Sequence, residues 1–353
     1  MRNFKLKFLS VLLAVIMFVT FVPNSVYAAV ADLISYNETE STMENDTENG
    51  EEGFKEVYAI GEDISKRTEN TKYIRMSDGS YYVAMYSNAV HYKDENGDWQ
   101  EIDNTLFDSL AADSDDVVGV ATSKGKHTVK FANNSNSSKL VAIKQYKYKI
   151  SFNLVGANKS KAATVTNPTE HAEDATELEK ITVLNKIISS VKYSDILDGV
   201  DLEYVVSGND VKENIIVKEK ADEYIYQFDM KLNKLVAEVQ DDGTIALKDD
   251  KSGEVVYTIA MPYMFDANGE QSNAVTYTLE QIKNKEYRIT VTADAEWINA
   301  EGRAFPVTID PSVEAGKSVA IDTYVRQSIP TTNYKNMVAS LVGFENTNAC
   351  YYY

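Results

Sequence analysis

The chain has 353 residues, enough for one large domain or for two to three ordinary domains with their own cores. Its 54 acidic residues outnumber the 35 basic ones, and the net charge of −19 argues against a nucleic-acid partner, because phosphate binding requires a basic surface. The single cysteine, Cys350, excludes a disulfide framework within the chain, and we expect a free, inert thiol.

The N-terminal segment has the layout of a secretion signal. Basic residues within 1–7 precede an apolar run at 8–22, and small residues lead up to Ala28. The run is shorter than the ~20 residues that span a bilayer. We expect cleavage after Ala28 and a secreted protein, extracellular or at the bacterial cell-wall surface and not membrane-embedded; an uncleaved membrane anchor is the alternative.

Residues 29–53 are acidic and contain no lysine or arginine. The stretch also has few apolar side chains, and their burial could not offset the entropy lost on ordering the chain. This composition predicts an acidic disordered spacer. From residue 54 onward the composition changes to short runs of Tyr, Val, Ile and Phe separated by turn residues.

These runs predict an all-β fold with two strand-rich blocks, residues 54–156 and 180–312, each resembling a β-sandwich or barrel. Strict alternation of apolar and polar residues at 146–154 and 287–292 is typical of half-buried strands. Hairpin turns are expected at 77–80, 133–138 and 241–243.

Residues 157–179 separate the two blocks and are rich in Ala, Thr, Asn and Glu, which predicts a linker or long loop. The following residues, 178–189, allow either a short helix or a strand. Their β-branched content allows a strand equally well, and periodicity cannot decide over so short a stretch.

Catalytic motifs are absent from the sequence: there is no nucleophile elbow, zinc-protease motif or dinucleotide-binding fingerprint. The three histidines, His91, His127 and His171, lack metal-ligand spacing and are interpreted as surface or strand-edge residues. We therefore expect no enzymatic activity, no catalytic residue, no bound metal and no cofactor.

A carboxylate cluster is the remaining candidate for chemistry, because glycosidic cleavage needs one protonated and one ionised acid. If 200–206 is a strand, Asp201 and Glu203 share one face and could bind a cation or a sugar, whereas a solvated face opposite a buried one is the simpler interpretation. Calcium is a possible ion, but no calcium-binding motif supports it. Residues 94–98 resemble a calcium-binding loop, yet their glycine is fourth in the loop rather than sixth, so we expect a hairpin turn there and at 266–270. The cluster consists of Asp195, Asp198, Asp201 and Glu203.

Trp99 and Trp297 are candidate sugar-stacking residues, since exposed aromatic faces are what a protein offers to a sugar ring. Packing in the core is the alternative for each tryptophan.

Several segments together resemble the N-terminal region of secreted bacterial wall-associated proteins of the RHS/YD-repeat type, which carry DNRLRE-type domains. The final segments resemble the opening strands of such a domain, a jelly roll similar to carbohydrate-binding modules. The matching stretches are NAVHYKD at 88–94, GDWQEIDNTL at 97–106, Tyr204, VKENII at 211–216, YTIAMPYM at 257–264, Asp266, Trp297, RAFPVTIDP at 303–311, DTYV at 322–325, Pro330, NY at 333–334 and LVG at 341–343.

The resemblance implies a surface protein with a β-rich, non-catalytic front part, followed by repeats and in some members by a C-terminal toxin. Residues 313–353 correspond to the truncated start of the DNRLRE-type domain, so we expect an incomplete sequence and carry over no toxin activity. The expected function is a non-catalytic cell-wall segment that binds or presents at envelope polysaccharide. The alternatives are a polysaccharide-degrading enzyme fragment with a carboxylate pair near Asp201, or a spacer without a ligand.

Net charge constrains how such a segment would stay on the wall. Walls that bear phosphate polymers are anionic and would repel a chain of net charge −19. Aromatic stacking and hydrogen bonds to glycan, or bridging by a cation such as calcium, are therefore the expected means of retention.

Overall fold

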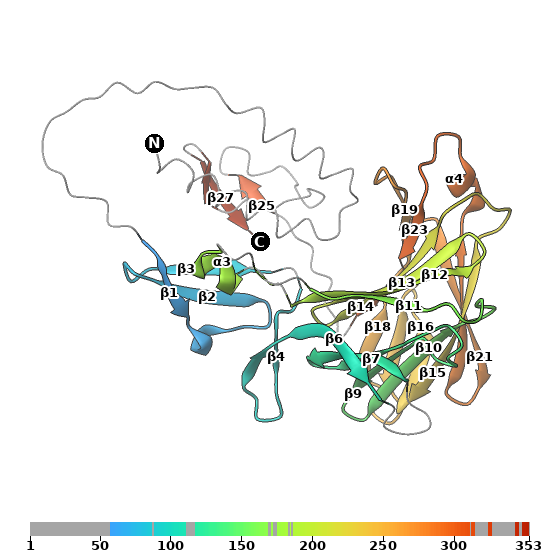
Figure 1. Cartoon of the computed structure of the whole chain (residues 1–353), viewed down its shortest axis with the longest axis horizontal. Coiled ribbons are helices and arrows are strands. Elements are labelled where there is room, and N and C mark those ends of the chain that lie inside the picture. Colours follow the sequence, from blue (N-terminus) through green and yellow to red (C-terminus); the bar gives the residue numbers. More distant parts are fainter. Residues whose placement is uncertain are drawn as a thin grey trace, which may run out of the picture. The chain divides into compact units, whose positions relative to one another are not determined.

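The computed structural model describes residues 57–310, apart from 87, 111–116, 169–170, 172–174, 183 and 185, together with the backbone of short strands within 312–352. The chain divides into two units, residues 37–316 and a second unit formed by 1–36 with 317–353. Antiparallel strands account for most of the described residues, which confirms the predicted all-β class (Figure 1). None of the described helices is long and apolar enough to span a bilayer.

The larger unit contains an eight-stranded antiparallel sheet. Its order is β21-β22-β15-β10-β9-β8-β7-β6. The strands are β6 (Asp103–Ser109), β7 (Gly119–Lys124), β8 (Thr128–Ala132), β9 (Val141–Gln145), β10 (Tyr148–Leu154), β15 (Ile225–Asn233), β21 (Val275–Lys283) and β22 (Glu286–Ala293).

A second sheet of eleven strands follows the order β11-β12-β13-β14-β24-β18-β17-β16, with β19, β20 and β23 attached beside it. These strands are β11 (Ala163–Thr166), β12 (Ile188–Leu197), β13 (Val200–Ser207), β14 (Asp210–Val217), β16 (Leu235–Val239), β17 (Ile245–Asp249), β18 (Val255–Ile259), β19 (Tyr263–Phe265), β20 (Gln271–Ser272), β23 (Val307–Asp310) and β24 (Ser312–Glu314).

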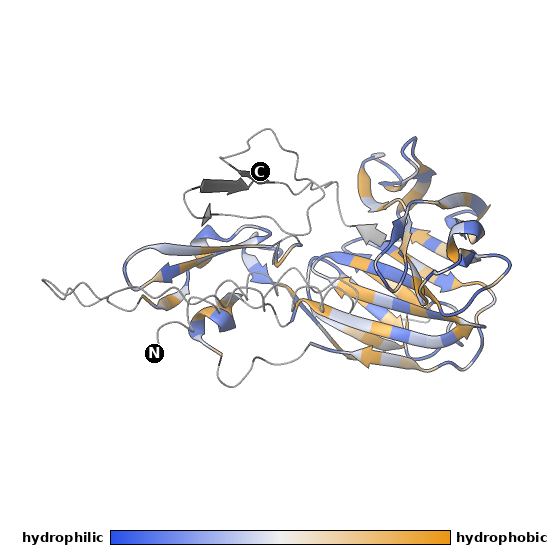
Figure 2. Cartoon of the chain, turned by 90° about the horizontal axis from the view of Figure 1, so that it is seen from above, coloured by the Kyte–Doolittle hydropathy of each residue, from blue (hydrophilic) through white to orange (hydrophobic). Residues whose placement is uncertain are grey.

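The two sheets share one hydrophobic core. The rings of Phe131 on β8 and Tyr204 on β13 lie 5.7 Å apart, and the Tyr193 hydroxyl on β12 donates to the Ala132 carbonyl at 2.6 Å. Hydrophobic and hydrophilic residues alternate along many of the strands (Figure 2), the pattern of strands that bury one face. Full burial of one such large apolar side chain is worth about 1.5–3 kcal/mol, which makes this core the main source of stability.

Strand pairing joins the two predicted strand-rich blocks. Ile150 of β10 lies opposite Leu232 of β15, so strands from both sides of residues 157–179 belong to one sheet. The intervening segment itself contributes β11 to the other sheet.

Residues 178–189, whose sequence allows either a helix or a strand, contain parts of both. Helix α3 spans Glu177–Thr182, and β12 begins at Ile188. Thr176 starts the helix through a reciprocal pair of hydrogen bonds: its hydroxyl accepts from the Glu179 N–H at 3.2 Å, and Glu179 Oε2 accepts from the Thr176 N–H at 2.7 Å. This capping box decides the conformation locally.

Two small sheets precede the core: β1 (Ala59–Glu62), β2 (Thr71–Met76) and β3 (Tyr81–Met85) form one, and β4 (His91–Lys93) with β5 (Trp99–Glu101) forms the other. A single 3-10 turn, η2 (Ile64–Lys66), follows β1. Two asparagines link this region to the core strands: the Asn88 amide donates to the Ser207 hydroxyl at 2.9 Å, and the Asn209 amide donates to the Glu69 carboxylate at 3.3 Å.

The predicted turns lie at the expected positions. Between β4 and β5, the Asp94 carboxylate accepts from the backbone N–H groups of Asn96 and Asp98, at 2.9 and 3.0 Å. Asp266 makes the same contacts with Asn268 and Glu270 between β19 and β20. Both carboxylates are thus used inside hairpin turns, which confirms the expected turns.

In the second unit the structure describes only the backbone of β25 (Tyr324–Arg326), β26 (Gly343–Glu345) and β27 (Asn348–Tyr352), paired in the order β25-β27-β26. Cys350 belongs to β27, and its side chain lies outside the described part. The predicted signal sequence, the predicted spacer at 29–53 and most of the predicted jelly-roll start also fall outside the described residues.

Candidate functional site

The acid cluster predicted from the sequence is held in ion pairs. Asp201 is buried, accepts from the Asp195 N–H at 2.8 Å, and pairs with Lys192 and Lys218, each at 2.9 Å. Burial alone would raise the pKa of Asp201, but the hydrogen bonds and the two ammonium groups lower it to about 2. A general acid needs the opposite shift, so Asp201 has the properties of a structural carboxylate.

The other acids of the cluster make separate contacts. Glu203 accepts from the Asn214 amide at 3.3 Å, Asp198 accepts from Asn158 at 3.3 Å, and Asp195 pairs with Lys218. Leu202 and Tyr204 are buried on the opposite face of β13, as the alternation predicts.

Replacing Asp201 by asparagine is expected to lower the free energy of unfolding by about 1–2 kcal/mol at pH 7, since Lys192 and Lys218 lose their shared carboxylate. Because the folded-state pKa lies below the ordinary value of 3.8, this contribution is present above that value and is lost as the pH falls towards 2. Urea unfolding of both proteins at pH 7 and pH 3 measures it; equal stability at pH 7 would contradict it.

Both predicted sugar-stacking tryptophans have cations over their rings. Lys93 Nζ lies 5.0 Å from the centroid of Trp99 on β5. Trp297, in helix α4 (Ala295–Asn299), is covered at 3.5 Å by the guanidinium of Arg303. Each ring is half-buried, so stacking on a sugar would require displacement of its cation.

Exposed aromatic side chains gather instead on residues 57–85. Tyr58 is 64% exposed, Tyr81 43% and Tyr82 41%. We call this set the β1–β3 apolar surface, which includes both faces of β3 because successive residues of a strand point to opposite sides: Val57, Tyr58, Ile60, Ile64, Tyr81, Tyr82, Val83 and Met85. Exposed aromatic side chains of this kind are candidates for interaction sites.

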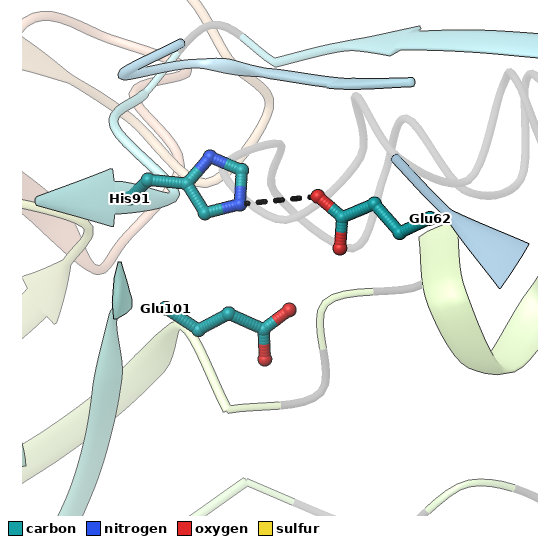
Figure 3. Close-up of side chains that lie close together, drawn as sticks. All are labelled: Glu62, His91 and Glu101. Atoms are coloured by element: carbon teal, nitrogen blue, oxygen red, sulfur yellow. Dashed lines mark ion pairs between the residues drawn. The ribbon is translucent and has the colours of Figure 1, made fainter. Parts of the chain in front are cut away.

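Glu62, His91 and Glu101 converge from β1, β4 and β5 (Figure 3). Each offers one potential ligand atom, and these atoms lie within 4.8 Å of one another. A histidine and two carboxylates form a suitable donor set for a transition metal.

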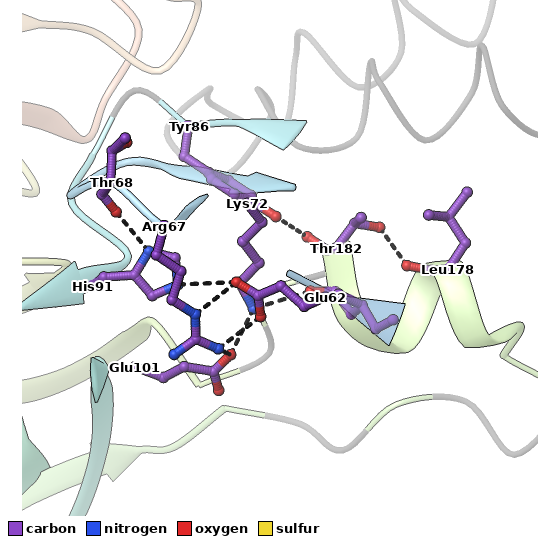
Figure 4. A network of polar contacts seen from close by, with 10 residues as sticks. Glu62, Arg67, Thr68, Lys72, Tyr86, His91, Glu101, Leu178 and Thr182 are labelled. Atoms are coloured by element: carbon purple, nitrogen blue, oxygen red, sulfur yellow. Dashed lines mark hydrogen bonds and ion pairs between the residues drawn. The ribbon is translucent and has the colours of Figure 1, made fainter. Parts of the chain in front are cut away.

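Two cations already neutralise these carboxylates (Figure 4). Arg67 donates from Nε and Nη2 to the two Glu62 oxygens at 2.6 Å, and Lys72 Nζ lies 2.8 Å from Glu101. Burial would raise the pKa of Glu101, but Lys72 and Arg67 lower it. Metal binding would require displacement of both cations, so the geometry is that of a partly buried ion network rather than a metal centre.

His91 is fully buried in this network. Its Nδ1 lies 2.7 Å from the Thr68 carbonyl oxygen, while Nε2 has no hydrogen-bond partner in the described part of the chain and lies 3.7 Å from Glu62. Burial lowers the pKa of His91, and the charge of Arg67 adds to the effect, which favours neutral imidazole. Burial likewise lowers the pKa of His127 to about 4. Of the two interpretations, surface or strand-edge residue, the first is therefore wrong for both histidines, because each ring is buried.

A pocket of about 490 Å³ lies beside the ion network. Its walls come from segments far apart in the sequence, which explains why sequence analysis missed it. The lining residues are Glu62, Lys72, Val90, Glu101, Ile102, Asp103, Lys124, His171, Lys180, Ile181, Leu184, Lys186 and Ile187.

A further carboxyl group lies between the two large sheets. Glu213 continues the inward alternation of Val211 and Ile215 on β14, and its buried Oε1 has no hydrogen-bond partner among the described atoms. Burial raises the pKa of Glu213 to about 8; the Tyr204 hydroxyl opposes this shift and the charge of Asp310 adds to it. The adjoining cavity of about 20 Å³ is the size of one water molecule, too small for an organic ligand.

No protein-family model matches the chain, and no solved structure matches it. Among curated proteins, it is similar to proteins named as tRNA nucleases and to one named as a wall-associated protein. It is 28% identical over 349 residues to the tRNA nuclease WapA of Bacillus subtilis (strain 168), and equally to the tRNA3(Ser)-specific nuclease WapA of Bacillus spizizenii. In both cases the match covers 94% of this chain and 14% of the relative.

A wall-associated protein of Geobacillus stearothermophilus is 24% identical over 221 residues, which cover 63% of this chain and 81% of that relative. The similarity to a wall-associated protein agrees with the expected cell-wall location.

The names of the relatives correct two expectations. The prediction that the protein is no enzyme is contradicted, because the relatives matched over most of this chain are tRNA nucleases. The argument against a nucleic-acid partner loses its basis for the same reason. Missing motifs and net charge describe only the stretch of sequence at hand, which spans 14% of these relatives.

Proposed function

We propose that this chain is the wall-binding region of a secreted, wall-associated protein of the RHS/YD-repeat type, and that its ligand is envelope polysaccharide. The observation that carries the proposal is the coverage of the relatives. The chain accounts for 81% of a protein named for wall association but only 14% of the tRNA nucleases. We therefore assign wall association, rather than nuclease activity, to the region that these proteins share.

The β1–β3 apolar surface supports this role. Its tyrosines combine a flat apolar face with a hydroxyl group, the chemistry suited to stacking on a sugar ring while hydrogen bonding to it. Tyr58 and Tyr82 are exposed, and neither has a cation over its ring in the described structure. Net negative charge does not oppose contacts of this type.

Replacing Tyr58 and Tyr82 together by alanine is expected to weaken binding to isolated cell-wall sacculi by a factor between about 5 and about 150, because each aromatic contact is worth about 0.5–1.5 kcal/mol. Co-sedimentation of the purified chain across a salt series, with and without calcium or chelator, measures the affinity. The matched control is Tyr146→Ala, which removes a tyrosine that is 69% exposed in the turn between β9 and β10.

Saturable retention that survives salt and is reduced only in the double variant supports the proposal. Equal loss in the double variant and in the control would contradict the assigned surface. Loss of retention on addition of chelator would show that calcium bridges chain and wall.

Nuclease activity on tRNA is the second candidate function, favoured by the names of the relatives that match 94% of this chain. Incubation of the purified chain with total tRNA, followed by denaturing electrophoresis, tests it. Discrete cleavage products would place the activity in this region, and intact tRNA would restrict the chain's part to wall binding.

A further inference from the structure

The pocket beside the ion network differs in charge from the protein as a whole. Aliphatic side chains form part of its lining, among them Val90, Ile102 and Ile187, and the polar part consists of four lysines, three carboxylates and one histidine. These lysines come from β2, β7, α3 and the segment before β12, so only the folded chain brings them together. They are Lys72, Lys124, Lys180 and Lys186.

Most of the acidic groups at the pocket already have partners. Glu62 is paired with Arg67, and Glu101 is paired with Lys72 and Arg67. Asp103 accepts from the Thr105 N–H at 3.0 Å and has no ion-pair partner among the described residues, so its charge offsets that of one lysine.

Two of the lysines have ammonium groups that are free to meet a ligand. Lys124 and Lys186 are exposed and have no side-chain partner among the described residues. Lys180 pairs only with Glu177, one turn earlier on the exposed side of α3. Exposed pairs of this kind are weak and easily exchanged for another anion. The charge that the pocket offers to a ligand is therefore positive, on a chain of net charge −19.

We propose that this pocket binds phosphodiester groups of an anionic wall polymer. The inference rests on the proposed wall-binding function and names a second ligand chemistry for it, distinct from sugar stacking. Ammonium groups are compact point charges that bind phosphate without demanding planar geometry. A volume of about 490 Å³ falls in the range of small-ligand pockets and accommodates a polymer repeat.

The lining favours a polymer without bases over RNA. Sites for single-stranded nucleic acid combine basic grooves with aromatic or arginine side chains on which the bases stack. No Phe, Tyr, Trp or Arg lines this pocket among the residues described. Aliphatic side chains beside lysines suit a flexible polyol phosphate chain.

The attraction between the pocket lysines and phosphate groups acts only at short range. Salt at physiological strength screens exposed charges beyond about 8 Å, so the negative charge elsewhere on the protein does not cancel the contact at the pocket. The contribution of the pocket to wall binding is expected to fall as the salt concentration rises, unlike the contribution of the tyrosines. Repeated phosphates along one polymer would strengthen a weak single contact.

The test uses the double variant Lys124→Gln/Lys186→Gln, with Lys159→Gln/Lys251→Gln as a control of equal charge change at exposed lysines outside the pocket. Binding of fluorescent poly(glycerol phosphate) is measured at low salt for both variants. We expect about tenfold weaker binding for the pocket variant and little change for the control, since two surface ion pairs are lost. Equal affinities of the two variants would overturn the inference.

Two further measurements separate this inference from the proposed function. Sacculi stripped of phosphate polymer should bind the pocket variant and the unmodified chain equally, whereas intact sacculi should bind the pocket variant less. Retention on stripped sacculi with no difference on intact sacculi would overturn the pocket assignment and leave polysaccharide binding in place. Binding of tRNA at the pocket in preference to the phosphate polymer would also overturn it.

Discussion

Replacement of Glu213 by glutamine is expected to stabilise the chain at pH 8 but not at pH 5. In the unmodified chain this group should lower the free energy of unfolding by about 3 kcal/mol as the pH rises from 5 to 8, and the glutamine variant should lack this decrease. The folded-state pKa of about 8 lies above the ordinary value of 4.5. The contribution of this group is therefore fully present below pH 4.5 and is lost as the pH rises through about 8. Ionisation between the two large sheets is costly because the buried Oε1 has no partner among the described atoms.

Urea unfolding of the chain and of the Glu213→Gln variant across this pH range isolates the effect, since all other titrating groups are common to both proteins. The two stability curves should meet near pH 5 and separate as the pH rises, with the variant more stable. Parallel curves would show that the carboxyl group is ionised in the folded protein without penalty. Glu219→Gln, which removes an exposed carboxylate, is the matched control and should follow the curve of the unmodified chain.

Replacement of Arg303 by methionine is expected to destabilise the fold by about 3 kcal/mol. Arg303 Nη1 lies 3.0 Å from Asp266 Oδ2 and 2.6 Å from Glu270, Nε donates to the Trp297 carbonyl at 3.1 Å, and the guanidinium covers the Trp297 ring. The side chains of Arg303 and Asp266 are 7% and 2% exposed. Methionine keeps the aliphatic stem but leaves the Asp266 charge buried without its counter-ion.

The double variant Asp266→Asn/Arg303→Met is the matched control. It removes the orphaned charge and should recover part of the lost stability, which an additive loss would contradict. Burial would raise the pKa of Asp266, and Arg303 is the main group that lowers it. The single variant should therefore be least destabilised, relative to the unmodified chain, at acid pH where Asp266 is protonated.

Local signals made the individual strands and turns predictable. Alternation at 146–154 corresponds to β10 and that at 287–292 to β22, because a half-buried strand must alternate. Side chains such as Asp94 fix turns with contacts only a few residues away. Strand order depends on contacts between distant segments, so the pairing of β10 with β15 could not be predicted.

The candidate sites also combine residues that local sequence patterns reveal with residues that only folding brings near them. Asp201 was found by sequence because acids cluster around it, but its partner Lys218 comes from beyond β14 and removes it as a catalytic candidate. The pocket lysines share no sequence pattern, since Lys72 and Lys186 meet only after folding. Glu213 did carry a signal: a charged residue between Val211 and Ile215 occupies an inward position of an alternating strand.

The central claim is that this chain binds the bacterial cell wall through its own surface. Co-sedimentation of the purified chain with isolated sacculi, with intact and phosphate-stripped walls compared over a salt series, tests it most directly. We expect saturable binding to both wall preparations, with an additional salt-sensitive component on intact walls only. Absence of retention on either preparation at every salt concentration would contradict it.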